Sequence, residues 1–262
     1  MDYGRYTENL EISLDAGILR VALDNPPMNC NTKALHNALT RIWSDVHDDD
    51  DVRVVVFTGK GRAFSAGGDI KAMQHTVDHP EEWWPTATEA KRIVYRMLEC
   101  DKPIIARVNG HAIGFGATLA LACDIIVAVE TAKFGDPHVN AGLVAGDGGA
   151  VLWPQAIGFP RAKEALLLGE TISAKRAEEI GLINYALPAD QLDAKVDEIA
   201  GKLARGAQRA IRWTKQTINL QLRQIAHPVM ELGMANETLS QFSDDHAEAV
   251  KAFAEKRDAK FE

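Results

Sequence analysis

The segment 59–71 reads Gly59-Lys60-Gly61-Arg62-Ala63-Phe64-Ser65-Ala66-Gly67-Gly68-Asp69-Ile70-Lys71 and directly follows the apolar run Arg53–Thr58. Small residues in such a turn let a ligand approach the backbone, whose free N–H groups can then donate hydrogen bonds to it. The lysine and the hydroxyl do not stand at the GxxxxGK[ST] spacing, which excludes a P-loop. Taken alone, the segment predicts either a binding turn lined by backbone or a flexible surface loop.

A second glycine-rich segment has the same setting. Asn109-Gly110-His111-Ala112-Ile113-Gly114-Phe115-Gly116-Ala117-Thr118 follows the apolar run Pro103–Val108 and leads into an apolar helical pattern. The first turn of a helix presents unpaired N–H groups and a positive partial charge. Two such donors from separate loops, aimed at one point, would form an oxyanion hole, in which each donor is worth about 10²–10³ in rate.

The chain around these loops alternates strand and helix patterns, which predicts an α/β fold with a largely parallel sheet of ββα or βαβ units. Continuous β-branched runs are typical of strands that are buried on both faces. Such runs occupy Arg53–Thr58, Pro103–Val108 and Asp124–Val129, and a strand pair is expected at Glu11–Ser13 and Ile18–Asp24. Apolar spacing predicts helices at 32–47, 88–98 and 114–123. His75–Pro85 is expected to be a surface loop, either beside a cavity or held on the body by its tryptophans.

The last third of the chain is helical in pattern. Ser173 is expected to cap a helix that ends at Gly181. Further helices are expected at Gln191–Arg205, Ala207–Ile225, Val229–Phe242 and Asp244–Glu255. A helical tail after an α/β body predicts a lid or an oligomerisation arm.

Composition narrows the class of protein. The 262 residues carry 29 Lys and Arg against 37 Asp and Glu, a net charge of −8, which disfavours nucleic acid as a partner. No stretch approaches the roughly 20 apolar residues that cross a membrane, and the first residues lack the pattern of a secretory signal. The cysteines, Cys30, Cys100 and Cys123, are odd in number and widely spaced, which predicts free thiols and a cytoplasmic protein.

Five motifs occur in an order that resembles the crotonase superfamily, the enoyl-CoA hydratase/isomerase family, over essentially the whole chain. They are 63–71, 108–116, 122–128, Phe134-Gly135-Asp136-Pro137 and 252–261. The resemblance implies a spiral of ββα turns with an acyl-CoA site at residues 1–200. It also implies a helical region at residues 201–262 that builds homotrimers, or hexamers as dimers of trimers. Coenzyme A would enter as part of the substrate, with no separate cofactor.

The resemblance also implies the site residues. The backbone N–H groups of Gly68 and Phe115 would hold the thioester oxygen, and the acyl-CoA would bind along Ala66, Gly68, Asp69, Ile70, Lys71 and Phe115. Lys256 and Arg257 would either reach CoA phosphates of a neighbouring subunit or form a solvated helix end. The histidines lack metal-ligand spacing, so no metal site is expected.

The chain departs from the family at its acid–base positions. The hydratases of the family place glutamates where Thr118 and His138 stand here. Threonine cannot transfer protons at neutral pH, whereas the ordinary pKa of histidine lies near it. Asp147 either caps the helix that follows it or orients His138, an arrangement that resembles the carbon–carbon bond hydrolases of the superfamily. Glu237 is expected on the surface of the tail.

Three hypotheses follow from these residues. The first is an acyl-CoA enzyme of the enoyl-CoA hydratase/isomerase type, a lyase or isomerase that stabilises an enolate, with His138 and Asp147 handling protons. The second is a hydrolase of β-diketone-type carbon–carbon bonds or of thioesters. The third is a CoA-binding protein without hydratase activity. Under the first hypothesis, Gly68→Pro deletes a donor and lowers turnover by at least about 10².

Overall fold

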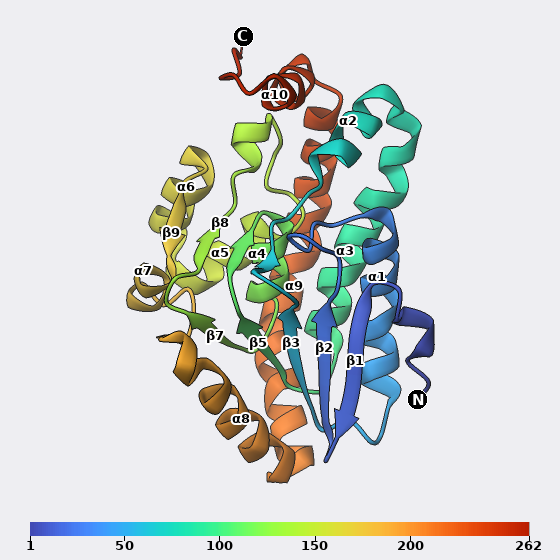
Figure 1. The fold of residues 1–262 in the computed structure, drawn as a ribbon, viewed down its shortest axis with the longest axis vertical. Helices are drawn as coiled ribbons and strands as arrows, with labels where there is room; N and C mark the ends of the chain where they lie inside the picture. Colours follow the sequence, from blue (N-terminus) through green and yellow to red (C-terminus); the bar gives the residue numbers. More distant parts are fainter. Residues whose placement is uncertain (262) are drawn as a thin grey trace.

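The computed structural model describes residues 1–261 (Figure 1). It contains a six-stranded sheet. Its strand order is β1 (Leu10–Asp15), β2 (Ile18–Leu23), β3 (Val54–Gly59), β5 (Ile104–Val108), β7 (Ile125–Val129) and β10 (Tyr185–Leu187). The β1–β2 pair is an antiparallel hairpin, and every later pairing is parallel. The runs predicted as buried strands form β3, β5 and β7, so the largely parallel sheet is confirmed.

A second, four-stranded sheet leads into the two glycine-rich loops. It consists of β4 (Ala63–Ser65), β6 (His111–Ile113), β8 (Lys133–Gly135) and β9 (Thr171–Ser173). Three of these short strands directly follow a long one: β4 follows β3, β6 follows β5 and β8 follows β7. Because the short strands pair in the same order as the long ones, each turn of the chain repeats its predecessor. This repetition confirms the predicted crotonase-type α/β spiral, and it brings the ends of β4, β6 and β8 to one region of the molecule.

Helices α1 (Lys33–Asp48) and α3 (Trp83–Glu99) lie side by side against the sheet (Figure 1). Thr32 caps α1, because its Oγ1 accepts the N–H of Leu35 at 3.3 Å. The expected loop at His75–Pro85 is wrong: α2 (Ile70–Asp78), the 3-10 helix η2 (Pro80–Glu82) and the start of α3 occupy it. Trp83 is buried and holds α3 to the body through a 2.9 Å hydrogen bond to Thr238, whereas Trp84 is exposed.

The middle of the chain is made of short elements. Ser173 caps α7 as predicted, since its Oγ accepts the N–H of Arg176 at 3.2 Å. The remaining elements are η1 (Gly4–Tyr6), α4 (Phe115–Leu121), η3 (His138–Ala141), α5 (Gly149–Ile157), α6 (Phe159–Leu168), α7 (Ala174–Glu179) and α8 (Ala189–Arg205). The expected division at residue 200 falls inside α8, and it stays a prediction.

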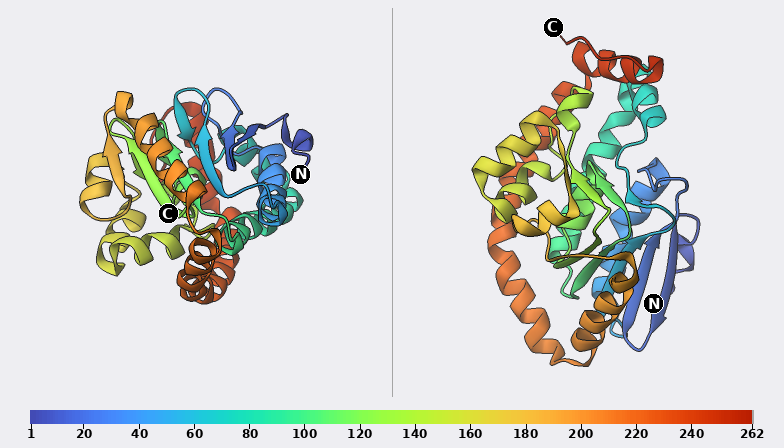
Figure 2. Two further views of the ribbon diagram at one scale, coloured as in Figure 1. Left: turned by 90° about the horizontal axis from the view of Figure 1, so that it is seen from below. Right: turned by 60° about the vertical axis from the view of Figure 1, so that its left-hand side comes forward.

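The tail differs from expectation in one respect. The helices predicted at 207–225 and 229–242 are one helix, α9 (Gln208–Gln241), which continues through Pro228. Proline removes one backbone hydrogen bond, but contacts with α3 and α5 support the helix on both sides of it. Figure 2 shows α9 running along one side of the molecule toward α10 (Asp244–Glu255). Within residues 1–261, none of the helices has the length and apolar character of a membrane span.

Candidate active site

A cavity of about 600 Å³ opens beside the two glycine loops. Its wall is formed by loop residues, by α2 and α3, by η3, and by the sides of α9 and α10 that face them. Five of the predicted substrate-binding residues line it: Ala66, Gly68, Asp69, Ile70 and Phe115. Lys71 is exposed and lies outside the lining, so this residue is placed away from the cavity.

The two glycine loops touch each other. A methyl group placed on Gly67 would lie 2.5 Å from the carbonyl oxygen of Ile113 and 3.4 Å from Cα of Gly114. The φ angles of these glycines are +79° and +55°, a region that other residues rarely adopt. Within residues 1–261, the N–H groups of Gly68 and Phe115 donate no hydrogen bond to the protein. Both residues predicted as oxyanion donors thus line one cavity with their N–H groups free.

The acid–base candidates meet at the same cavity. His138 begins η3, and its Nδ1 is hydrogen-bonded to Oδ1 of Asp136. On the other side of the ring, Nε2 lies 3.3 Å from Oδ2 of Asp147. Thr118, fully buried on α4, donates from Oγ1 to Oδ1 of Asp147 at 3.5 Å. The chain therefore brings together the three positions singled out in the sequence, and Asp136 joins them.

Asp147 contacts His138 and does not cap the helix that follows it. Helix α5 begins after Gly148, and no side chain accepts the N–H groups of its first turn. Asp147 is buried, lines the cavity and faces the imidazole. The capping alternative is therefore wrong, because Gly148 is the N-cap of α5 and the carboxylate of Asp147 contacts Thr118 and His138 instead.

The electrostatics of the cluster favour a charged imidazole. Burial by itself would lower the pKa of His138, but the negative charges of Asp136 and Asp147, with hydrogen bonds to both, hold that pKa well above its usual value. The imidazole of His138 therefore favours its charged form, with a carboxylate beside each of its nitrogens.

Glu237 belongs to this site, and its expected surface position is wrong. It is 3% exposed, lines the cavity and accepts the N–H of Gly146 at 3.1 Å through Oε2. Burial, helped by the charge of Asp147, raises the pKa of Glu237 well above its usual value. Glycines at 146 and 233 let α9 approach the loop, since a methyl on Gly146 would lie 2.3 Å from the Gly233 carbonyl oxygen. The buried residues of α9 recur at helical spacing, and this pattern could have predicted that Glu237 lies on the buried face of the helix. These residues are Ala226, Met230, Gly233, Met234 and Gln241.

His36 is a second residue that the sequence did not reveal. It is buried on α1, lines the cavity and packs its ring 4.9 Å from the ring of Phe115. Burial lowers the pKa of His36 to about 4, so it is neutral at neutral pH. Its position beside Leu35 and Leu39 on the apolar face of α1 is that of a core residue, so the sequence carried no signal of the cavity.

Other residues singled out in the sequence have structural partners. Asp69 caps α2, accepting the N–H groups of Lys71 at 2.8 Å and Ala72 at 3.1 Å. Arg257 is paired with Glu248 and Glu255, and His111 accepts the N–H of Lys133 at 3.1 Å. The three cysteines are free thiols, and Cys30 lines the cavity.

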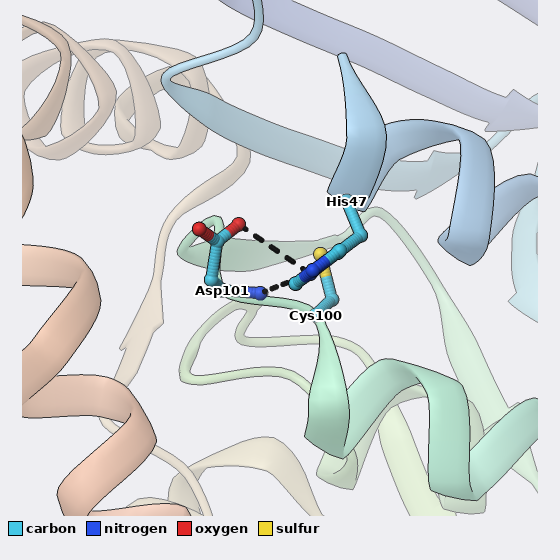
Figure 3. Close-up of side chains that lie close together, drawn as sticks. All are labelled: His47, Cys100 and Asp101. Carbon is cyan, nitrogen blue, oxygen red and sulfur yellow. Dashed lines mark hydrogen bonds and ion pairs between the residues drawn. The ribbon is translucent and has the colours of Figure 1, made fainter. Parts of the chain in front are cut away.

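Two clusters within residues 1–261 have metal-ligand composition. One is the Asp136–His138–Asp147 cluster, in which both imidazole nitrogens already contact a carboxylate. The other joins His47, Cys100 and Asp101 at the end of α3 (Figure 3). There Asp101 lies 3.3 Å from Nζ of Lys102 and 3.7 Å from Nη1 of Arg212, and burial raises the pKa of Cys100 to about 11. Two cations and a neutral thiol do not suit a metal ion.

Comparisons with known proteins agree with this architecture. The family model for enoyl-CoA hydratase/isomerase matches residues 13–262. A crotonyl-CoA hydratase from Syntrophomonas wolfei is 35% identical over 263 residues, covering 97% of this chain and 98% of the relative.

Two solved structures are also similar. An enoyl-CoA hydratase/isomerase from Mycobacterium paratuberculosis has a TM-score of 0.89 and 35% identity, covering 93% of this chain and 97% of its own. A β-diketone hydrolase from the cyanobacterium Anabaena, bound to (S)-3-oxocyclohexyl acetic acid, has a TM-score of 0.85 and 32% identity, covering 92% and 98%. The chain belongs to the enoyl-CoA hydratase/isomerase family of the crotonase superfamily.

Proposed function

We propose that this protein is an acyl-CoA enzyme of the hydratase/isomerase type that forms a thioester enolate. The observation that carries the proposal is the pair of free N–H groups at Gly68 and Phe115, on touching loops that line one cavity. Donors fixed before the reaction stabilise the negative charge that develops on the thioester oxygen, each by about 10²–10³ in rate. The family of the chain supports a CoA thioester as the substrate.

Proton transfer is assigned to His138 and Asp147, which lie beside the two N–H donors. A methyl placed on Gly114 would lie 3.8 Å from Cε1 of His138, so the imidazole adjoins the second donor loop. In hydration, Asp147 accepts a proton from water as the hydroxyl group adds to the β-carbon and the electron pair of the double bond moves toward the thioester oxygen. The enolate collapses when the α-carbon takes the Nε2 proton of His138. The proton on Asp147 then passes to Nε2, which restores both groups. Thr118 holds Asp147 and takes no part in the transfer.

The test of the oxyanion donors uses a matched pair of substitutions. Gly68→Pro and Gly68→Ala both add a Cβ atom, which would lie 2.3 Å from Cε of Met73, so the two variants share the same steric effect. Only proline also removes the backbone N–H. With a panel of short enoyl-CoA substrates, kcat in Gly68→Pro should be at least about 10² below that of Gly68→Ala. Equal turnover in the two variants contradicts the assignment.

A second candidate is a hydrolase of β-diketone-type carbon–carbon bonds. It is favoured by the carboxylate–imidazole–carboxylate arrangement at His138 and by the similarity to the β-diketone hydrolase structure. Water would lose a proton to Asp147 and add to one carbonyl carbon. The bond to the neighbouring carbon would then break, its electron pair forming an enolate that His138 protonates.

Product mass separates the candidates. The protein is incubated with a short enoyl-CoA and with a cyclic 1,3-diketone: hydration adds 18 mass units to the thioester, whereas hydrolysis adds the same mass to the opened ring. Isomerisation leaves the mass unchanged and moves the double bond. Tight acyl-CoA binding without any product supports the third hypothesis, a binding protein.

The tail is proposed to form a homotrimer or a hexamer. Exposed apolar side chains on α6 and α9 support an interface there: Phe159, Leu167, Leu168, Trp213, Ile218, Leu232 and Leu239. Light scattering of the eluted protein should give a mass of three or six chains, and a monomer at micromolar concentration contradicts the proposal.

A further inference from the structure

Asp136 is the most deeply buried acidic group of the site. It follows β8 in the chain, its side chain is fully enclosed, and Oδ1 is hydrogen-bonded to Nδ1 of His138. The other oxygen, Oδ2, is buried without a hydrogen-bond partner within residues 1–261. A carboxylate in such a place is costly unless something nearby stabilises its charge. The imidazolium of His138 is the cation in contact with it.

The unbonded Oδ2 of Asp136 lies against Gly149, at the start of α5, where any side chain would collide with it. A methyl placed on Gly149, the first residue of that helix, would lie 1.9 Å from Oδ2. The positive end of the helix dipole therefore faces the carboxylate, which favours its charged form. Any larger residue at position 149 would push Asp136 away from His138.

The contact with Asp136 decides which way the imidazole faces. Because Nδ1 is held by Asp136, Nε2 is directed at Asp147 on the cavity side. The other titratable groups near His138 are Glu237 on α9 and His246 on α10. Burial lowers the pKa of His246, whose Nδ1 is bonded to the Ala141 carbonyl, so it adds no positive charge at neutral pH.

We propose that Asp136 is the positioning residue of the site: it fixes the Nδ1 proton of His138 and keeps the imidazole charged, with Nε2 presented to Asp147. This inference rests on the proposed proton-transfer role of His138. Asp136 itself is enclosed behind the ring and does not touch the substrate space. Its effect on the reaction is therefore exerted through the imidazole.

The test is an NMR titration of His138 in protein labelled at histidine, compared between the unchanged protein and Asp136→Asn. Asparagine has the same shape but lacks the charge, so the pKa of His138 should fall by about 1–3 units. In steady-state assays, kcat/KM should fall by about 10² above neutral pH and recover as the pH is lowered, with KM little changed. A role limited to packing would lower kcat/KM equally at every pH.

Asp49→Asn is the matched control, because Asp49 is also a buried carboxylate but pairs with Tyr3 near the N-terminus. It should leave the titration of His138 unchanged. If Asp136→Asn does not fold, the unchanged protein should still show a downfield Nδ1 proton that is absent from His138→Gln.

The proposal is overturned if the His138 pKa is the same in Asp136→Asn, or if the unchanged protein lacks that proton signal. The titration needs no substrate. A protein that turns over no thioester or diketone therefore contradicts the proposed function without deciding the role of Asp136.

Discussion

Gly149→Ala adds one methyl group at the start of α5, at the most constrained point of the site. The methyl would lie 1.9 Å from Oδ2 of Asp136 and 3.2 Å from Cβ of Ala145. To restore an ordinary contact, the carboxylate must move by about 1 Å or more, a strain that costs about 1–3 kcal/mol in a packed interior. For a domain of this size that lowers Tm by about 2–10 °C. The shift pulls Asp136 from His138, so kcat/KM should fall by about 10².

Gly201→Ala is the matched control, because Gly201 also lies in a helix, α8. A methyl there meets the Arg205 guanidinium at 3.0 Å, and this is the mobile end of a side chain on the surface. Alanine favours a helix over glycine by about 0.5–1 kcal/mol, so Gly201→Ala should raise Tm slightly and leave kcat/KM unchanged. Thermal melts followed by circular dichroism, with steady-state kinetics, measure both variants. A Gly149→Ala protein that melts and turns over like the unchanged protein refutes the reasoning.

Three further substitutions test the charged groups at Asp147, Glu237 and Lys215. Asp147→Asn removes one of the charges that raise the pKa of His138, so in an NMR titration the imidazole should titrate about 1–3 pH units lower, and an unmoved titration contradicts the pairing. The raised pKa of Glu237 favours its neutral form in the folded state. Stability should therefore fall as pH rises from the ordinary glutamate value through the raised one; Glu237→Gln should abolish that fall in urea titrations. Lys215→Met removes the buried ammonium group that lies 2.7 Å from Asp124, whose side chain is partly exposed, and should cost about 1–3 kcal/mol of unfolding free energy; the double variant Lys215→Met/Asp124→Asn should recover most of it.

Much of the fold was predictable because its strands are strongly patterned. The run Arg53–Thr58 is apolar on both faces, so it could only be a buried strand, and β3 lies between β2 and β5. The helix at 32–47 was predictable from its apolar spacing and its threonine cap. The segment His75–Pro85 was not, because its charged residues and prolines suit the first turns of short helices as well as they suit a loop. The continuous helix α9 was not predictable either: two helices were expected at 207–225 and 229–242, because the packing that supports α9 through Pro228 cannot be seen in the local sequence.

Only those residues of the site that lie in short sequence motifs could be predicted. The glycine loops and His138 lie in such motifs, and the structure places them at one cavity. Asp136 lies two residues before His138, a spacing at which nothing in the sequence tells whether the side chains face each other. Glu237 lies on a helix about a hundred residues further along the chain. It reaches the site because Gly146 and Gly233 let the helix and the loop approach closely, and a contact between such distant segments cannot be predicted from the local sequence.

The donors at Gly68 and Phe115 belong to the main chain, and every residue except proline supplies the same N–H. The side chains that surround the proposed proton-transfer centre come from separate segments: Thr118 on α4, His138 on η3, Asp147 before α5 and Glu237 on α9. Under the proposed function, substitutions of these side chains change the proton-transfer chemistry, whereas the backbone donors to the thioester oxygen stay the same. A directed-evolution library restricted to these four positions would therefore explore new reactions on a scaffold whose proposed donors are unchanged.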